Sequence, residues 1–432
     1  MRTEPALGVS GPVRTDFYVF IADRLIRGAV GFAVTGAIGR QMGPEVFGWF
    51  SYAGAVVSFG AAFANLGLDS IVVRESVSRP ASVARIMAAA FVWRLVIGAL
   101  AAAMIAAALP WISGPGALQR GLLAIALFGA FGPAFAVPML WFQARTQARV
   151  AVRAGLWGFG LVTALRLWLL WRGASPFAFA WASAIETVGA PLLVFGAMTR
   201  RGGRLEFQQL WCEGKALLHE AWPLLVGALA ATLYMRVDQI MLRWLSGADA
   251  VGLYAAATRF SDAAYAIPFL AGASAMATLT AAAQDPVRFP ALLSRYVRAS
   301  AALGYALVIP LIAAAPLVVP LAYGRDFSDA STIAQIHLLS VVFVSISVAR
   351  GRVLVIRGLT RFAMWTAVIG GGVNVVLNAA LIPRWGAAGA AVATVVAHAT
   401  AALLTTLVYR PTRELGWCQV RALLRPGLRI SI

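Results

Sequence analysis

Long apolar segments separated by short polar ones recur along the chain from residue 17 to residue 409. A helix needs about 20 apolar residues to cross a bilayer core of ~30 Å, and each segment is long enough to supply them. Turn signals between the segments divide the chain into twelve predicted membrane-spanning helices. Their ranges are 17–38, 46–68, 86–109, 118–142, 151–171, 176–198, 217–242, 250–280, 296–322, 331–356, 362–383 and 388–409.

The composition supports this membrane assignment. The 432 residues are 61% hydrophobic and only 12% charged, whereas soluble domains are about a quarter charged. A net charge of +19 would otherwise suggest nucleic acid as a partner. The basic residues, however, lie between the apolar segments and do not form one stripe. We therefore predict an all-α polytopic membrane protein whose surroundings are the lipid bilayer and which binds no nucleic acid.

The basic residues also predict an orientation. If the N-terminus is cytoplasmic, the cytoplasmic segments hold 24 of the 36 basic residues, Arg350 and Arg352 among them, and the six external loops hold one arginine each. Lys and Arg accumulate in short cytoplasmic loops. Both termini are therefore predicted to be cytoplasmic, which requires an even number of spans. Cys212 and Cys418 then lie in the cytoplasm, where a disulfide is not expected.

One short phrase occurs twice. GPEVFGWF (Gly43–Phe50) and GADAVGLY (Gly247–Tyr254) align at an offset of 204, which matches Gly48 with Gly252. Each phrase opens the second span of a six-span block. Two six-helix halves enter the membrane in the same direction, so we expect a pseudo-twofold axis along the membrane normal. The predicted organisation is a first half at 1–200, a cytoplasmic linker at 201–216, a second half at 217–410 and a basic cytoplasmic tail at 411–432.

Several stretches resemble one transporter family. RQMGPEVFGWFSYAGAVVSFGAAFANLGLDSIVVRESV (Arg40–Val77) and VDQIMLRWLSGADAVGLYAAATRFSD (Val237–Asp262) resemble signatures of polysaccharide exporters, the O-antigen flippases of the multidrug-and-toxin-extrusion-like superfamily. LAYGRDFSDAS (Leu321–Ser331) and NVVLNAALIPRWGAAGAAVATVVAH (Asn374–His398) resemble two further signatures. The resemblance covers most of the chain in outline and is specific over about a quarter of it.

The resemblance implies a twelve- or fourteen-helix transporter with a V-shaped central cavity in a bacterial inner membrane. Its cargo would be a polyprenyl-diphosphate-linked oligosaccharide, flipped from the cytoplasmic to the outer leaflet for synthesis of lipopolysaccharide or another surface polysaccharide. Polysaccharide polymerase and assembly proteins would be its protein partners. No cofactor is expected.

Once the charged residues nearer the span ends are counted with the loops, ten charged residues remain within the predicted spans, and each costs roughly 2.5–3.5 kcal/mol at mid-membrane unless it faces the bundle interior. They are Arg24, Arg27, Arg94, Arg166, Arg236, Arg259, Asp23, Glu186, Asp238 and Asp262. Arg94 and Arg166 are expected to be structural or to lie near an interface.

Helical spacing separates paired from unpaired charges. Asp23 and Arg27 are four residues apart and can pair on one face, and Arg259 and Asp262 are within reach of each other. Arg236 and Asp238, two apart, point to nearly opposite sides. Because guanidinium groups match phosphate oxygens with two hydrogen bonds, we predict a cationic substrate site at Arg24, Arg27, Arg236 and Arg259. The acids Asp23, Asp238, Asp262 and Glu186 would pair with arginines or couple an ion.

The remaining polar residues in or near the spans carry weaker signals. Asn374 and Asn378 are spaced by four residues, as are Thr394 and His398, and they are expected to make interhelical hydrogen bonds. His219 and His337 are placed near span ends. No spacing typical of a metal site occurs, so neither a metal nor a catalytic residue is predicted.

Three other functions remain open. A peptidoglycan-precursor flippase or an ion-coupled drug exporter of the same superfamily would share the fold. The excess of intramembrane arginine over acid favours an anionic cargo over a drug cation. A membrane glycosyltransferase or polymerase is less favoured, because the longest external segment is only about ten residues and no catalytic motif appears.

The predicted orientation is testable by cysteine labelling. Cysteines introduced at Gly114 or Gly247 should react with a membrane-impermeant thiol reagent added to intact cells, because both positions lie in predicted external loops. Cysteines at Arg149 or Arg288, and the native Cys212 and Cys418, should react only after permeabilisation. The reverse pattern would overturn the orientation.

Overall fold

The computed structural model describes residues 11–114, 116–285 and 287–427, with side chains from Ile26 onward except at positions 148, 223, 230, 231 and 277. Over these ranges the chain is helical and contains no strand. The first part forms α1 (Gly11–Asn65), α2 (Asp69–Ser78), α3 (Val83–Ile112), α4 (Ala117–Ala126), α5 (Gly132–Phe135), α6 (Val137–Ala144), α7 (Ala148–Trp171) and α8 (Pro176–Arg200). The second forms α9 (Leu210–Leu245), α10 (Ala248–Ala282), α11 (Arg288–Tyr323), α12 (Ala330–Leu338), α13 (Ser340–Ile356), α14 (Thr360–Ala399), α15 (Thr405–Val408) and α16 (Arg413–Leu424).

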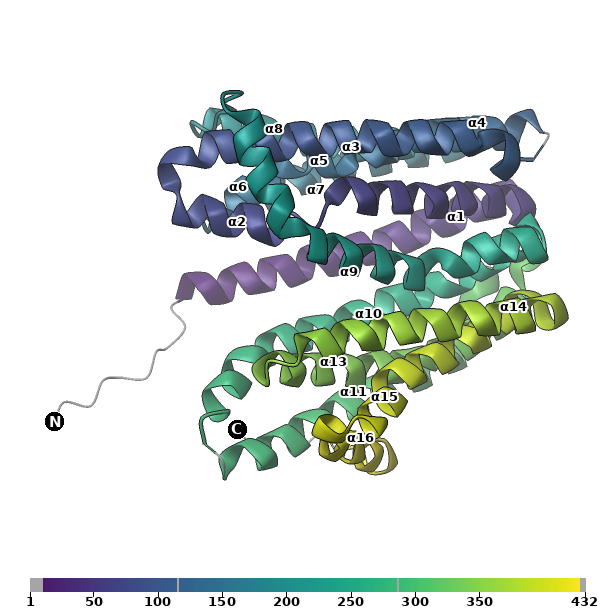
Figure 1. The fold of residues 1–432 in the computed structure, drawn as a ribbon. Coiled ribbons are helices and arrows are strands. Elements are labelled where there is room, and N and C mark those ends of the chain that lie inside the picture. Colours follow the sequence, from purple (N-terminus) through teal and green to yellow (C-terminus); the bar gives the residue numbers. More distant parts are fainter. Residues whose placement is uncertain (1–10, 115, 286, 428–432) are drawn as a thin grey trace.

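The helices form two groups that meet along α1, α9 and α10. Figure 1 shows α3–α8 in the upper part of the view and α10, α11 and α13–α16 in the lower part, with α1 and α9 between them. Nine segments of the described residues are long and apolar enough to cross a membrane. This confirms an all-α polytopic fold. The continuous helix α10, predicted as the span 250–280, is not among the nine, so the count of twelve stays a prediction.

Two of the long helices contain sharp glycine corners. α1 turns at Gly43, where φ is 72°, and α14 turns at Gly386, where φ is 53°. Each corner lies between two predicted spans. Glycine can form such a corner because it adopts positive φ without the steric cost that a Cβ imposes. Gly247, the repeat partner of Gly43, likewise has a φ of 95° and lies directly before α10. The repeated phrase therefore builds the same kind of turn twice.

The predicted span 118–142 is broken into pieces. After α4 the backbone tightens into a 3₁₀ segment at Leu127–Phe131, and α5 and α6 follow as two short helices. Pro133 and Pro138 explain the breaks, because each lacks the N–H that would continue the α-helical ladder.

Helix α9 begins earlier than predicted. It starts at Leu210 inside the predicted linker 201–216, and Trp211 packs against Trp93 of α3 with ring centroids 5.4 Å apart. Leu217 and Ala221 belong to the same buried cluster as Ile86 and Trp141 in the first part of the chain. The start of α9 therefore packs on the first predicted half, although its sequence position assigns it to the second. The domain division itself stays a prediction.

Helices α1 and α10 cross at the two matched glycines. A Cβ added at Gly48 would overlap the Ala248 carbonyl oxygen, and a Cβ added at Gly252 would overlap the Pro44 carbonyl oxygen. Ala248 and Pro44 are themselves matched by the offset of 204. Contacts of this reciprocal kind are what a twofold axis produces between equivalent surfaces. The crossing therefore agrees with the predicted repeat.

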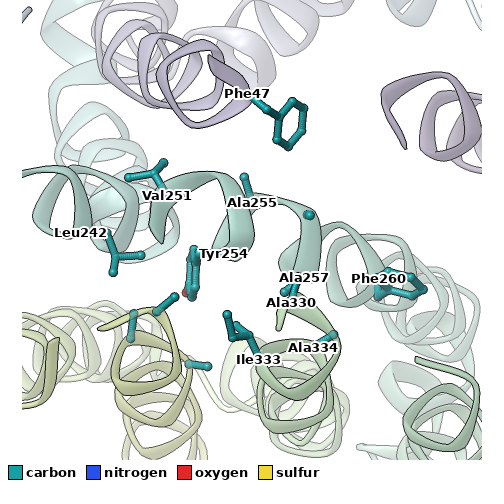
Figure 2. Close-up of a cluster of buried hydrophobic side chains, with 14 of the residues drawn as sticks. Phe47, Leu242, Val251, Tyr254, Ala255, Ala257, Phe260, Ala330, Ile333 and Ala334 are labelled. Carbon is teal, nitrogen blue, oxygen red and sulfur yellow. The ribbon is translucent and has the colours of Figure 1, made fainter. Parts of the chain in front are cut away.

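A buried cluster surrounds this crossing and joins both groups of helices. Figure 2 shows Phe47 on α1 facing α10, and Tyr254 pointing away from α1 on the other side of α10. Polar contacts also join α1 to α11 at the end of the molecule where Gly43 lies. The Arg40 guanidinium donates to the carbonyl oxygens of Pro320 (3.2 Å) and Leu321 (2.5 Å) at the end of α11. The two groups are thus closed against each other at the end where Gly43 and Gly247 lie.

The crossing predicts a sharp response to one added methyl group. Gly48→Ala or Gly252→Ala should destabilise the protein by about 1–3 kcal/mol, because the methyl meets a backbone carbonyl that cannot rotate away. Thermal unfolding in detergent measures the effect. Gly160→Ala in α7 is the matched control, since a Cβ there has no heavy atom within 4 Å. Equal stabilities of the crossing and control variants would refute the close approach.

Candidate functional site

A cavity of about 240 Å³ lies between the two groups of helices, and we call it the central cavity. From the first part of the chain α1, α4 and α8 line it, with Ser51, Ser183 and Thr187 among the polar groups. From the second part it receives Arg236 of α9 and both Arg259 and Asp262 of α10. Two of the four arginines of the predicted cationic site therefore meet in one cavity.

Asp262 is the one acid in the lining of the central cavity. Arg236 and Arg259 both act electrostatically on its carboxyl group. In the part of the chain that the structure describes, however, neither arginine forms an ion pair within 4.0 Å. The predicted neighbourhood of Arg259 and Asp262 is present, but direct pairing between them is not. Two guanidinium groups with one nearby carboxylate leave an excess of positive charge in the cavity.

A second cavity of about 550 Å³ lies within the second group of helices, and we call it the C-terminal cavity. It shares Arg236, Gln239, Thr258 and Asp262 with the central cavity. Its other polar groups come from α9, α10, α12, α13 and α14. The shared residues form the wall between the two cavities, so a change of charge in one acts on the other.

Asp238 is the centre of a buried hydrogen-bond network next to the C-terminal cavity. Its carboxylate accepts from the Tyr254 hydroxyl (2.5 Å), the Thr394 hydroxyl (2.8 Å) and the Asn378 amide (2.6 Å). Asn378 also donates to the Asn374 side-chain oxygen at 3.0 Å. The predicted interhelical role of Asn378 is thus present in the structure.

The network supplies donors to Asp238 but no counter-charge. These three hydrogen-bond partners are neutral groups, and the Asp238 side chain is only 3% exposed. The side-chain oxygen of Asn378 is buried beside it without a hydrogen-bond partner. A carboxyl buried among neutral groups is stabilised by taking up a proton or a cation. Chemically, this cluster can hold one small positive charge.

Other intramembrane charges are paired within the first part of the chain. Glu186 of α8 forms an ion pair with Arg166 of α7 at 2.7 Å. Arg94 of α3 is fully buried, pairs with Asp69 at 2.8 Å and donates to the Pro133 carbonyl oxygen at 3.1 Å. Of the two roles predicted for Glu186, these contacts favour pairing.

The first segment of α1 carries the other predicted members of the site. The guanidinium of Arg27 lies over the Phe159 ring of α7, 5.2 Å from its centroid, and is not among the groups lining either cavity. The side chains of Asp23 and Arg24 lie outside the described residues. The assignment of Arg24 and Arg27 to the cationic site stays a prediction, as does the pairing of Asp23 with Arg27.

The positions of two buried side chains, Arg350 and His337, differ from those predicted from the sequence. Arg350 was assigned to a cytoplasmic segment, but it is 6% exposed within α13. It donates to the Ala401 carbonyl oxygen (2.5 Å) and to the hydroxyls of Thr366 (3.0 Å) and Thr406 (3.2 Å). His337 was placed near a span end, but it is buried in α12 with its Nδ1 2.8 Å from the Ser261 hydroxyl.

The position of Arg350 has a physical explanation that sequence spacing does not contain. Ala401 lies in a π-helical turn, Thr400–Leu404, next to α14. A π turn shifts the backbone hydrogen bonds by one residue and is common at functional sites. The carbonyl acceptor and the arginine are about fifty positions apart in sequence, so no local pattern links them. The apolar residues on both sides of Arg350 were the available signal.

Solved structures with similar folds are transporters. The lipid II flippase MurJ in an inward-closed conformation superposes with a TM-score of 0.71 at 13% identity, covering 93% of this chain and 90% of that one. An inward-facing multidrug resistance MATE transporter of the MOP superfamily gives 0.72 at 15% identity, covering 95% and 99%. A MOP-superfamily transporter from Pyrococcus furiosus gives 0.64 at 14% identity, covering 94% and 96%. These likenesses establish the fold.

The sequence itself establishes the family. No curated protein matches the chain. The sequence model of a family described as polysaccharide biosynthesis protein, however, matches residues 37–332, which are more than half of the chain. This match confirms the resemblance carried by Arg40–Val77 and Val237–Asp262. The chain belongs to the polysaccharide biosynthesis protein family and has the fold of the MOP-superfamily transporters.

Proposed function

We propose that the protein flips a polyprenyl-diphosphate-linked oligosaccharide from the cytoplasmic to the outer leaflet of a bacterial inner membrane. The observation that carries the proposal is the positive charge of the central cavity, where Arg236 and Arg259 face a single nearby carboxylate, Asp262. A diphosphate supplies the missing negative charge. Each guanidinium offers two parallel N–H donors that match phosphate oxygens.

The size of the central cavity bears on mechanism. Its 240 Å³ is smaller than the roughly 300–1,000 Å³ of sites that enclose drug-sized ligands. It therefore accommodates a charged headgroup but not an oligosaccharide. We infer that the sugar enters only when the two groups of helices move apart, as in alternating access. Elements from both groups line the cavity, so their separation would enlarge it.

Two related functions compete with this proposal. A peptidoglycan-precursor flippase is favoured by the fold shared with the lipid II flippase MurJ, while the family description favours polysaccharide synthesis. A drug exporter is favoured by the fold shared with the MATE transporter. A cationic drug, however, would meet two arginines and one acid in the central cavity. The proposal also places both termini in the cytoplasm. It includes polysaccharide polymerase and assembly proteins as partners.

We further propose that Asp238 couples transport to an ion. The membrane potential alone provides about 2.3 kcal/mol per charge per 100 mV when an anionic cargo leaves a negative interior. Uptake of a proton or sodium ion at Asp238 would add a second driving force. The partnerless oxygen of Asn378 and the hydroxyls of Tyr254 and Thr394 supply further oxygen ligands beside the carboxylate.

The cationic site predicts separate effects on export and on folding. Arg236→Gln or Arg259→Gln should reduce surface polysaccharide at least tenfold in a host lacking its own flippase, while the membrane level stays normal. Lysine at the same position should restore only part of the export, because it keeps the positive charge but lacks the paired N–H donors of the guanidinium group. Surface polysaccharide and an immunoblot of membranes measure the two effects.

The controls distinguish binding from structural pairing. Arg384→Gln removes an exposed arginine that donates to the Ala380 carbonyl oxygen of its own helix, and it should leave export unchanged. If Arg259 served only to balance Asp262, Arg259→Gln should lower the membrane level, and adding Asp262→Asn should recover both level and export. Full export by Arg236→Gln/Arg259→Gln at normal level would exclude the cationic site.

The coupling proposal predicts loss of ion dependence in Asp238→Asn. The variant should fold, because the Asn378 amide can rotate and offer its partnerless oxygen to the new amide group. The transport rate is measured in proteoliposomes at a fixed membrane potential while sodium concentration and pH are varied. The rate should depend on one of these variables in the wild type and on neither in the variant. An ion dependence that survives in the variant would place coupling elsewhere.

A further inference from the structure

A large groove lies away from the transport cavities, between the start of α11 and α16. We call it the basic groove, and its volume is about 640 Å³. Four arginines line it from three parts of the chain: Arg298 of α11, Arg357 after α13, and Arg421 and Arg425 at the end of α16. We propose that the basic groove binds the headgroup of an anionic phospholipid from the leaflet beside it.

The lining of the groove carries an excess of positive charge. Glu414 is the one acid in its lining, against four arginines. Among the described residues none of these arginines forms an ion pair within 4.0 Å, and the hydrogen bond that Arg298 donates to the Ser294 hydroxyl is long, at 3.4 Å. Arg298 and Arg421 both act electrostatically on Cys418, so their charges converge on the same wall.

The first part of the chain provides a contrast with the basic groove. There Arg74 is paired with both Glu75 and Glu220, and Arg79 is paired with Glu75 at 2.9 Å and with Glu213 at 3.1 Å. These two arginines thus have carboxylate partners within 4.0 Å. The second part gathers four arginines around a concave surface and supplies one carboxylate.

The walls of the groove favour a lipid over a soluble phosphate compound. Phe289, Pro290, Leu293, Leu415 and Leu424 supply apolar surface next to the arginines. A phospholipid needs both kinds of surface, because its phosphate continues directly into glycerol and acyl chains. Arginine forks beside apolar walls at the level of the headgroups are a recurrent feature of lipid-binding pockets between helices.

Helix α16 has the features of a helix that lies at a membrane interface. Leu415 and Ala422 are buried in a cluster with Leu293 and Val353, which fixes α16 against α11 and α13. Trp417 and Leu424 remain 55% and 77% exposed. The Leu423 carbonyl oxygen accepts from the Tyr305 hydroxyl at 3.2 Å, and Tyr305 belongs to the apolar segment Arg288–Tyr323. The Tyr305 contact thus ties α16 to α11, and exposed Trp and Leu on an amphipathic helix are typical of helices that lie at a membrane interface.

Thermal unfolding of the purified full-length protein tests the proposal. Phosphatidylglycerol added to the detergent should raise the unfolding temperature by a few degrees over an equal amount of phosphatidylcholine, because a ligand of the folded state stabilises it by mass action. Arg298→Gln/Arg357→Gln/Arg421→Gln should lose at least three quarters of this difference. The matched control, Arg172→Gln/Arg325→Gln/Arg384→Gln, removes the same charge from exposed sites outside the groove and should keep it.

Further arms separate the remaining outcomes. Glycerol 1-phosphate alone should produce no shift, and a shift equal to that of phosphatidylglycerol would replace the lipid by a soluble phosphoester. If the triple groove variant is not recovered from membranes, Leu424→Glu decides, because this exposed rim position places a negative charge in the groove without disturbing the core. Leu424→Glu should reduce the phosphatidylglycerol shift. A full shift in either groove variant would refute the site.

Discussion

Everything at the centre of the molecule depends on how closely the backbones of α1 and α10 approach at Gly48 and Gly252. A side chain at either position would overlap a carbonyl oxygen of the other helix. The close approach brings Phe47 of α1 against the surface of α10 and fixes the rotation of α10 about its axis (Figure 2). With that rotation fixed, Tyr254 points toward Asp238, while Arg259 and Asp262 point into the central cavity.

The second constraint is the cost of charge in a membrane, and the protein meets it in three ways. Arg94 and Arg166 have carboxylate partners on neighbouring helices. Arg350 instead bonds to a carbonyl oxygen of a π-helical turn and to threonine hydroxyls. Arg236 and Arg259 have neither arrangement in the described residues and lie at a cavity. Charges that the protein does not neutralise internally are those available to a ligand, which is why we assign the cargo to them.

Local features of the sequence predicted the fold, and long-range contacts limited the prediction of the site. The length of an apolar segment and the presence of a glycine are local features of the sequence. The helices, and loops at Gly43 and Gly247, could therefore be predicted from the sequence alone. Helical spacing also indicated that Arg236 and Asp238 do not pair, and the structure shows no ion pair between them, although both side chains line the C-terminal cavity. The acceptors of Arg350 and the packing of α9 from Leu210 depend on residues far away in sequence. No spacing rule reaches those contacts.

Helix α9 offers a physical link between the ion site and the cargo site that we propose. Its start is held to the first part of the chain by Trp211 against Trp93 and by the pairing of Arg79 with Glu213. Toward its end, Asp238 is bonded to Asn378 of α14. Arg236 lies only two residues before Asp238, about 3 Å along a rigid helix. Neutralising Asp238 with an ion would weaken its attraction for the donors on α10 and α14, and any resulting shift of α9 would carry Arg236 with it. Coupling of the kind that we propose would need no chain of intervening residues, because Arg236 and Asp238 lie on the same helix.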